Sequence, residues 1–220
     1  MVCKSGGNRL RIRTATPRDR RMTDQHFQVA IIGAGPAGMA AACTTTKAGL
    51  HTVVIDDQKD SGGQVYRNLR ANQSLSPTYL GDSYYAGTKL SDDFAACGAN
   101  YWTDCTVWQI TKSHEIAIVS GGKAELITAD YIIIATGAIE RAMPVKGWTL
   151  PGVMSVGGAQ TLLKQAALGA DGAVFVGSGP LLYLTVWQYI KAGLSVRAVI
   201  DTTGKAQWLS ALAFAPLALL

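Results

Sequence analysis

The chain has 220 residues, of which 48% are hydrophobic and 16% charged, so it can bury a substantial core and is not a disordered polypeptide. Its formal net charge of +5 is concentrated at one end, because residues 1–21 carry seven Lys and Arg side chains against the single acid Asp19. The remaining residues carry 13 basic and 14 acidic side chains, so the folded body is nearly neutral and no general attraction to nucleic acid follows.

The basic segment 1–24 is expected to be a disordered tail outside the folded unit. A nucleic-acid-binding arm is one alternative, but the segment has no aromatic residue to stack on bases. A transit-type presequence is another, although no apolar helical face is evident. The stretch from Met22 to Phe27 resembles an ordinary protein start just before the first strand.

Residues 28–56 follow the order strand, glycine turn, helix, strand. An apolar run enters the turn Gly33-Ala34-Gly35-Pro36-Ala37-Gly38, and a second apolar strand ends at Asp56 and Asp57. In such a unit the first Gly permits a tight turn, the second lets a diphosphate approach the backbone, and the third lets the helix pack closely. We expect the turn to bind a dinucleotide diphosphate through its amides. Asp56, or the adjacent Asp57, is expected to accept the ribose hydroxyls; a turn that binds nothing is the alternative.

The segment after these acids is predicted to reach the same ligand edge. Gly62, Gly63 and Gln64 lie on a loop at the carboxyl ends of the strands, where two glycines allow close approach to a cofactor. Residues 68–83 are polar and are predicted to form a surface loop. A helix is expected over about 87–98, with apolar side chains on one face.

Strands follow in close succession. They are predicted at 100–102, 106–110 and 115–119, and a turn at 120–123 leads to a further strand over 124–128, making a small antiparallel meander. The continuous apolar run 131–135 indicates a strand buried on both faces. It ends at Ala135-Thr136-Gly137, another turn of close approach.

Residues 173–201 repeat the plan of residues 28–56. The apolar run 173–176 enters Gly177-Ser178-Gly179-Pro180, and a later strand ends at Asp201. Leu182 stands at the third glycine position and should push the helix away from the strand or tilt it. This second unit either binds NAD or another adenine nucleotide through Gly177, Gly179, Pro180 and Asp201, or is a structural half that has lost its ligand. Two such units favour electron transfer between carriers.

The sequence gives little support to metal, disulfide or acid–base chemistry. The four cysteines form neither a C-x-x-C pair nor a metal-ligand cluster with the three histidines, and a reduced, cytoplasmic protein is the simplest inference. Neither a secretory signal nor a membrane span is visible. No catalytic acid, base or nucleophile can be named, and no metal is expected.

The combination of motifs resembles a known family. The first glycine turn, Asp56-Asp57, Gly62-Gly63-Gln64 and Ala135-Thr136-Gly137 are together similar to the flavoprotein oxidoreductases with two dinucleotide domains, related to glutathione reductase. More narrowly, residues 62–67, 135–141 and 147–154 resemble the nucleotide-binding subunits of opine oxidases, hydrogen cyanide synthase and proline or hydroxyproline dehydrogenases. The resemblance covers about residues 27–210.

The resemblance implies an α/β, three-layer Rossmann-like fold with a β-meander, followed by an incomplete second Rossmann-like unit. It implies FAD at the first turn, the loop with Gly63 and Gln64 near the flavin, and backbone contact of Val107 with the adenine. Ala135, Thr136 and Gly137 would mark where the chain passes the cofactor. Members work with a second flavoprotein subunit, and an Fe–S subunit or another electron acceptor is an open possibility.

The expected domains are an FAD-binding domain over 25–150, lacking its usual returning segment, and the first part of an NAD-like domain over 151–220. Because the family continues further, the sequence is expected to be a fragment or truncated product whose isolated form associates. The leading hypothesis is an FAD-dependent oxidoreductase subunit that oxidises an amino-acid or opine-type C–N bond with a partner subunit. The alternatives are a stand-alone NADH-dependent flavin reductase and a non-catalytic subunit for adenine-nucleotide binding or assembly.

Overall fold

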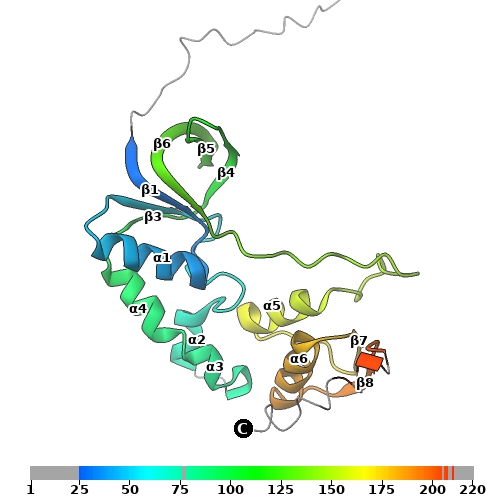
Figure 1. Cartoon of the computed structure of the whole chain (residues 1–220). Helices are drawn as coiled ribbons and strands as arrows, with labels where there is room; N and C mark the ends of the chain where they lie inside the picture. The colour runs from blue at the N-terminus through cyan, green and yellow to red at the C-terminus, as the bar shows by residue number, and fades with distance from the viewer. Residues whose placement is uncertain (1–24, 76–77, 205, 208–209, 211–220) are drawn as a thin grey trace, which may run out of the picture.

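The computed structural model describes residues 25–75, 78–204, 206–207 and 210, and the expected tail of residues 1–24 lies outside them. Two α/β units are joined by an extended connection that leaves the first sheet, projects outward and returns to a helix of the second unit (Figure 1). Within the described residues, no helix is both long and apolar enough to cross a bilayer.

The first unit is built on a six-stranded sheet of order β3-β2-β1-β6-β5-β4. Strands β1, β2, β3 and β6 run parallel, and β4, β5 and β6 form the antiparallel part. The strands are β1 (His26–Ile32), β2 (Thr52–Ile55), β3 (Asn100–Trp102), β4 (Cys105–Ile110), β5 (Glu115–Ser120) and β6 (Lys123–Ile134). The predicted Rossmann-like sheet with its meander is confirmed.

Two apolar cores lie on opposite faces of this sheet. Val29, Ile31 and Val54 face helices α1 (Pro36–Lys47) and α4 (Thr88–Ala96). The alternate residues of the same strands face the meander, which curls over the sheet and buries Ile116, Ile118 and Ile127. Helices, parallel sheet and meander are therefore the three layers visible in Figure 1.

One strand replaces the two that the sequence predicts over 124–128 and 131–135. Strand β6 pairs antiparallel with β5 through residues 123–128 and parallel with β1 through residues 128–134. Neither of the two residues between the predicted strands, Ala129 and Asp130, is a glycine or a proline, so nothing in the sequence ends the strand there. The meander and the parallel sheet are consequently one continuous sheet.

The prediction of a surface loop over 68–83 is wrong. The segment forms α2 (Leu69–Leu75), a 3-10 turn η2 (Thr78–Leu80) and the start of α3 (Asp82–Tyr85). Leu69, Leu80 and Tyr84 are buried together and form a small core of their own. Three apolar anchors among many polar residues are enough to fix the segment, which periodicity alone does not reveal.

The second unit contains α5 (Val156–Ala166), β7 (Ala173–Gly177), α6 (Pro180–Lys191) and β8 (Val196–Asp201). Its two strands are parallel, as the repeated plan predicts. Phe175, Leu182 and Tyr189 pack with Ala159 and Leu163 of α5 in one buried cluster. Leu182 thus fills the space between helix and strand as a core residue.

The helices of the second unit pack on the segment between β2 and β3. Gln188 of α6 donates to the Leu80 carbonyl oxygen at 3.2 Å and accepts from Gln160 of α5 at 3.0 Å, and both glutamines are buried. The segment that sequence reasoning leaves as a loop is therefore the platform on which the second unit rests.

Candidate functional site

Most of the predicted first-site residues converge where β1, β2 and β6 end. The Gly33 amide donates to the Ile55 carbonyl oxygen at 2.8 Å, and the Ala135 amide donates to that of Ile32, also at 2.8 Å. These bonds bring the turn Gly33–Gly38, which we call the first cradle, beside Asp56 and the Ala135–Gly137 turn. Carboxyl ends of parallel strands are the ligand edge of such sheets.

The three glycines of the first cradle are under different structural constraints. Gly33 has a φ of +102°, and a Cβ there would lie 2.5 Å from the Ala135 carbonyl oxygen. A Cβ on Gly38 would lie 1.8 Å from the Gly33 oxygen, so helix packing requires glycine. Gly35 has an ordinary φ of −71°, and the nearest atom to a Cβ would be the Gly63 Cα at 3.9 Å. The protein's own packing does not require glycine at position 35.

Helices α1 and α6 begin without a side-chain cap, whereas α5 has two. Gly35 and Gly179 are the N-cap residues of α1 and α6, and neither first turn contains an acid. In α5 the Ser155 hydroxyl accepts from the Gly158 amide at 3.1 Å, and the Glu140 carboxylate accepts from the Gly157 amide at 2.8 Å. The two glycine turns therefore leave amides available to an anion, where α5 satisfies its own.

Asp56 is directed inward. Its carboxylate accepts from the backbone amides of Ala34 and, at 2.7 Å, of Gln58, and the residue is only 8% exposed. Asp57 is exposed, and its carboxylate accepts from the Gln58 amide side chain at 3.0 Å. Of the two acids that the sequence offers for the ribose, the structure leaves Asp57 facing solvent, while Asp56 fixes the cradle to the end of β2.

The loop with the second pair of glycines packs directly on the first cradle. The Gly62 amide donates to the Ala34 carbonyl oxygen at 2.8 Å. A Cβ on Gly63 would lie 2.9 Å from the Gly35 Cα, so only glycine permits this approach. Arg67 at the end of the loop donates to the Gln58 side chain. The Gln64 side chain is exposed, so it is free to meet a ligand.

Two further predicted residues line one hollow. Val107 on β4 and Thr136 after β6 share an open depression with Ile32 and Ile134. The pairing of β4 with β5 shifts register between Val107 and Gln109, which is typical of a bulge that redirects side chains. Gly137 has a φ of +71° and open space around it.

In the second cradle, residues 177–182, the space beside the glycines is empty, whereas the carboxylate of Asp201 is already hydrogen-bonded. Gly177 and Gly179 have φ of +153° and +93°, with nothing within 4 Å of a Cβ on either, and Pro180 is exposed. Asp201 accepts from the Thr203 amide at 2.7 Å and from the Tyr183 hydroxyl. Hydrogen bonds from the Thr203 side chain, from Tyr183 and from the Thr203 amide, in that order of effect, lower the pKa of the Asp201 carboxyl. Tyr183, which sequence reasoning missed, thus occupies the carboxylate expected to bind ribose.

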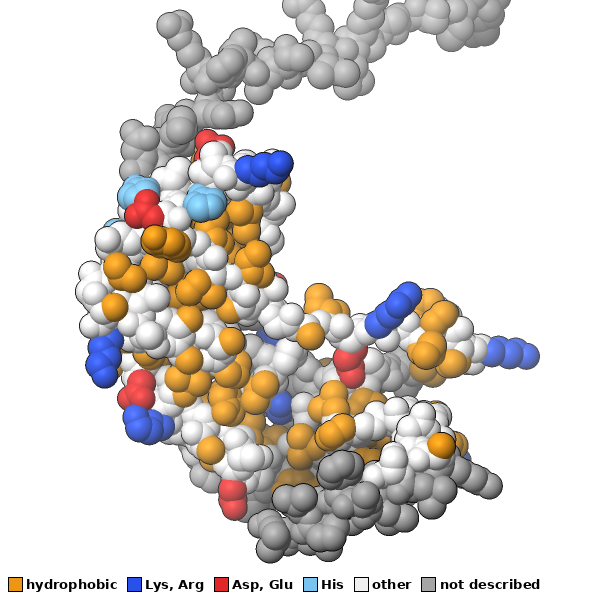
Figure 2. Space-filling model, in the orientation of Figure 1, with side chains coloured by type: hydrophobic (Ala, Val, Ile, Leu, Met, Phe, Trp, Pro, Cys, Tyr) orange, Lys and Arg blue, Asp and Glu red, His pale blue; other side chains and the backbone are white. Residues whose placement is uncertain are grey.

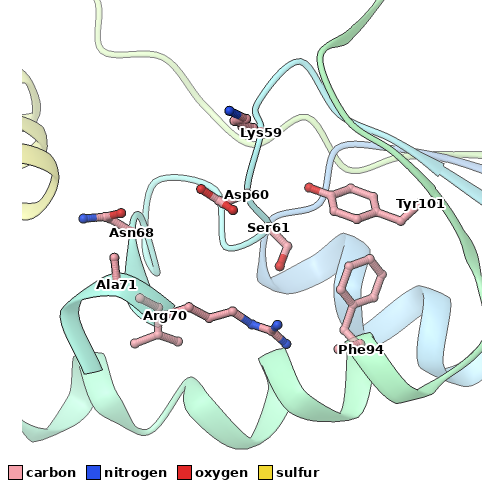
Figure 3. Close-up of a pocket in the computed structure, with 10 residues that line it drawn as sticks. Lys59, Asp60, Ser61, Asn68, Arg70, Ala71, Phe94 and Tyr101 are labelled. Atoms are coloured by element: carbon pink, nitrogen blue, oxygen red, sulfur yellow. The ribbon is translucent and has the colours of Figure 1, made fainter. Parts of the chain in front are cut away.

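A cavity of about 220 Å³ lies beneath the loop that follows Asp57. Figure 3 shows Asp60, Ser61 and Tyr101 on one side of it and Arg70 extending across from α2. The Tyr101 hydroxyl is buried without a hydrogen-bond partner among the described residues, and burial raises its pKa, helped by Asp56, Asp60 and Asp104. Arg70 is tied to Ser91 at 3.3 Å. Mixed charges line this cavity, so it is not an evident anion site.

A buried lysine is the other feature that sequence reasoning missed. Lys164 of α5 is 5% exposed, and its ammonium group donates to the Gln64 and Val65 carbonyl oxygens, each at 3.0 Å. Burial, and secondarily Arg67, lowers its pKa to about 8. A single lysine in a helix gives no sequence signal, since lysine is ordinarily exposed. Within the described part of the chain, no three His, Cys, Asp or Glu side chains are placed to hold a metal ion.

Comparison with protein families gives one match across most of the chain. Residues 27–201 fit the family model described as pyridine nucleotide-disulphide oxidoreductase. The match begins in β1 and ends at Asp201, so it includes both cradles.

Curated relatives and solved structures agree with this match. The chain is 40% identical over 185 residues to the A-type subunit of opine oxidase from Agrobacterium tumefaciens, covering 80% of this chain and 37% of that one. It is 37% identical over 176 residues to the hydrogen cyanide synthase subunit HcnB of Pseudomonas aeruginosa, covering 78% and 38%. L-proline dehydrogenase from P. horikoshii has the same fold, with a TM-score of 0.64 and 20% identity over 83% of this chain and 36% of that one. The chain thus spans about two fifths of the length of these relatives.

Proposed function

Because the chain belongs to the pyridine nucleotide-disulphide oxidoreductase family, we propose that its first cradle binds FAD and that it serves as an oxidoreductase subunit. The observation that carries this proposal is Gly35. The nearest protein atom to a Cβ there would be 3.9 Å away, and Gly35 is the N-cap residue of α1, a helix without a side-chain cap. An approaching diphosphate supplies the reason for glycine that packing does not.

The residues of the first site have distinct roles in this proposal. The amides of the turn Gly33–Gly38 that are not already bonded to Ile55 and Asp56 bind the diphosphate, with Pro36 and Ala37 in the first helical turn. Asp57 accepts from the ribose, and Asp56 holds the Ala34 amide in place. Gly63 and Gln64, Val107 and the turn Ala135-Thr136-Gly137 border the remainder of the cofactor. Bound flavin supplies the redox chemistry, and the protein binds and orients it.

We extend the proposal to substrate and partner from the relatives. The opine oxidase relative and HcnB are both named as subunits, and the structural neighbour is an L-proline dehydrogenase. Oxidation of an amino-acid or opine-type C–N bond is the reaction class that these names favour, and the word subunit in two of them favours a partner. That this partner is a second flavoprotein subunit is part of our proposal. The division into an FAD-binding domain over 25–150 and a second dinucleotide-type domain over 151–220 belongs to the same proposal.

The second cradle is proposed to take NAD(H) or another adenine nucleotide. Open glycines and an uncapped α6 favour this, while the bond between Tyr183 and Asp201 must open for a ribose to bind there. The same bond between Tyr183 and Asp201 supports the alternative, an assembly subunit without catalysis.

The decisive experiment compares Gly35→Ala with Gly49→Ala. Alanine in place of glycine at an N-cap costs about 0.5–1 kcal/mol, and alanine at Gly49, whose φ is +78° in open space, costs about 1–2 kcal/mol. We expect a loss of stability no larger in Gly35→Ala than in Gly49→Ala, but an FAD affinity at least tenfold weaker only for Gly35→Ala, measured by titration calorimetry. Equal FAD affinity in the two variants would contradict the proposed cradle.

Titrations with ADP and NADH separate the alternatives. Adenine-nucleotide binding without any flavin binding favours the assembly subunit. Reduction of bound flavin by NADH in the absence of a partner favours a stand-alone reductase.

A further inference from the structure

The ammonium group of Lys164 connects two parts of the chain that are a hundred residues apart in sequence. It lies on α5 of the second unit, yet both of its hydrogen-bond acceptors are carbonyl oxygens of the loop at Gln64 and Val65. The side chain is buried at 5% exposure, so these two bonds replace much of its hydration.

No carboxylate compensates this buried charge in the described part of the chain. The ion pairs found there involve other residues, and the charged group that acts on Lys164 is Arg67, which repels it. The Tyr84 ring lies 5.6 Å from the ammonium nitrogen and contributes a modest cation–π attraction. An apolar side chain would be less costly to bury here, so stability alone does not account for lysine.

The same residue is also held through its backbone. The Lys164 carbonyl oxygen accepts from Asn72 at 2.9 Å and from Asn68 at 3.3 Å. Asn72 donates in addition to the Tyr84 hydroxyl at 2.9 Å, which donates to the Arg67 carbonyl oxygen at 2.6 Å. The end of the loop 62–67 is therefore connected to α5 by a chain of buried and partly buried hydrogen bonds.

The other side of the loop is the first cradle. The Gly62 amide donates to the Ala34 carbonyl oxygen, and a Cβ on Gly63 would lie too close to the Gly35 Cα. The position of residues 62–67 is thus set by the cradle on one side and by Lys164 on the other. Residues 64 and 65 directly follow Gly63, whose backbone contacts Gly35, so the loop connects the Lys164 ammonium group to the first cradle.

From this geometry we propose that Lys164 is a positioning residue. It holds the loop 62–67 against the first cradle, so that a nucleotide bound at the cradle and the packing of α5 on the loop strengthen each other. The second half of this statement rests on the proposed FAD site. Coupling of this kind is reciprocal, since each event then favours the other by the same free energy.

The test uses Lys164→Met, which keeps an unbranched apolar stem as far as Cε but removes the ammonium group. Lys191→Met on α6 is the matched control, because Lys191 is an exposed lysine whose ammonium lies 5.8 Å from the Trp187 ring. Hydrogen exchange of the Gly62 and Tyr66 amides, which donate to Ala34 and Gly62, reports on the loop without any ligand. We expect at least tenfold faster exchange and at least tenfold weaker FAD binding in Lys164→Met, and no change in Lys191→Met.

The outcomes separate the two proposals. Wild-type protein that does not bind FAD overturns the proposed function, while faster exchange in Lys164→Met still supports the role in holding the loop. Unchanged exchange in Lys164→Met overturns the positioning role, whatever FAD does. If Lys164→Met does not fold, Lys164→Gln retains an N–H donor and a shorter reach. An intermediate exchange rate in that variant supports the proposal, and a wild-type rate overturns it.

Discussion

Two tyrosine hydroxyls are buried, and they differ in whether the structure gives them a hydrogen-bond partner. Tyr84 accepts from Asn72 and donates to the Arg67 carbonyl oxygen, and burial raises its pKa to about 12. Tyr101 has no hydrogen-bond partner among the described residues, but its ring packs edge to face on Phe94 at 5.2 Å. The first hydroxyl is therefore expected to stabilise the fold, and the second is not.

We predict that Tyr84→Phe lowers the free energy of unfolding by about 1–3 kcal/mol, because it leaves buried polar groups unpaired. Tyr101→Phe keeps the ring contact and should change it by less than about 0.5 kcal/mol, or raise it. Urea denaturation of both variants measures the difference. Similar losses in the two would show that the Tyr101 hydroxyl is bonded in solution.

At the level of single residues, the sequence predicts position better than orientation. The spacing of Gly33, Gly35 and Gly38 fixes their place at the end of β1, because a strand followed by a glycine turn and a helix has few geometries. It does not decide between Asp56 and Asp57, since that depends on which carboxylate reaches the Ala34 amide. Tyr183 and Lys164 could not be predicted as site residues, because their partners lie 18 and about 100 residues away.

Among the elements, α5 depends most clearly on its N-terminal cap. The side chains of Ser155 and Glu140 both accept hydrogen bonds from backbone amides of its first turn. Glu140 lies in the connection between the two units, so this cap also attaches the connection to the helix. The cap satisfies amides in the first turn of the helix that also carries Lys164 to the loop 62–67.

Ser155→Ala is expected to lower the free energy of unfolding by about 1 kcal/mol, the usual cost of removing a serine N-cap. Ser83→Ala is the control, because Ser83 is exposed within α3 and should change stability by less than about 0.5 kcal/mol. Thermal or urea unfolding measures both. A loss in Ser155→Ala no larger than that in the control would mean that the Glu140 carboxylate alone caps the helix.

The elements themselves are predictable where a single pattern covers them. Alternation or a continuous apolar run identifies β1, β2, β7 and β8, and the amphipathic pattern identifies α4. Residues 68–83 form short helices that are stabilised by contacts with distant elements, not by local periodicity, so sequence reasoning reads them as a loop. Helix α5 is absent from the predicted elements although it has a sequence signal, with Ser155 before Val156, Ala159 and Leu163 at helical spacing.

For the whole molecule, the second unit buries one face of its sheet and exposes the other. Phe175 is buried under the helices, but Val174, Val176 and Ile200 are each more than half exposed on the strands β7 and β8. Hydrophobic side chains also gather on the projecting connection, where Ile139 is 93% exposed (Figure 2). Contiguous apolar surface of this kind favours association.

The double variant Val174→Thr with Val176→Thr tests whether this sheet face drives association. Threonine retains the β-branched shape that suits a strand, and side chains already half exposed contribute little burial, so stability should fall by less than about 1 kcal/mol. We expect lower fluorescence of an apolar dye and less light scattering than for the unaltered chain. Val65→Thr, an equally exposed valine outside this face, should leave both unchanged. An unaltered dye signal in the double variant would place the adhesive surface elsewhere, with the connection around Ile139 as the next candidate because its side chains are the most exposed.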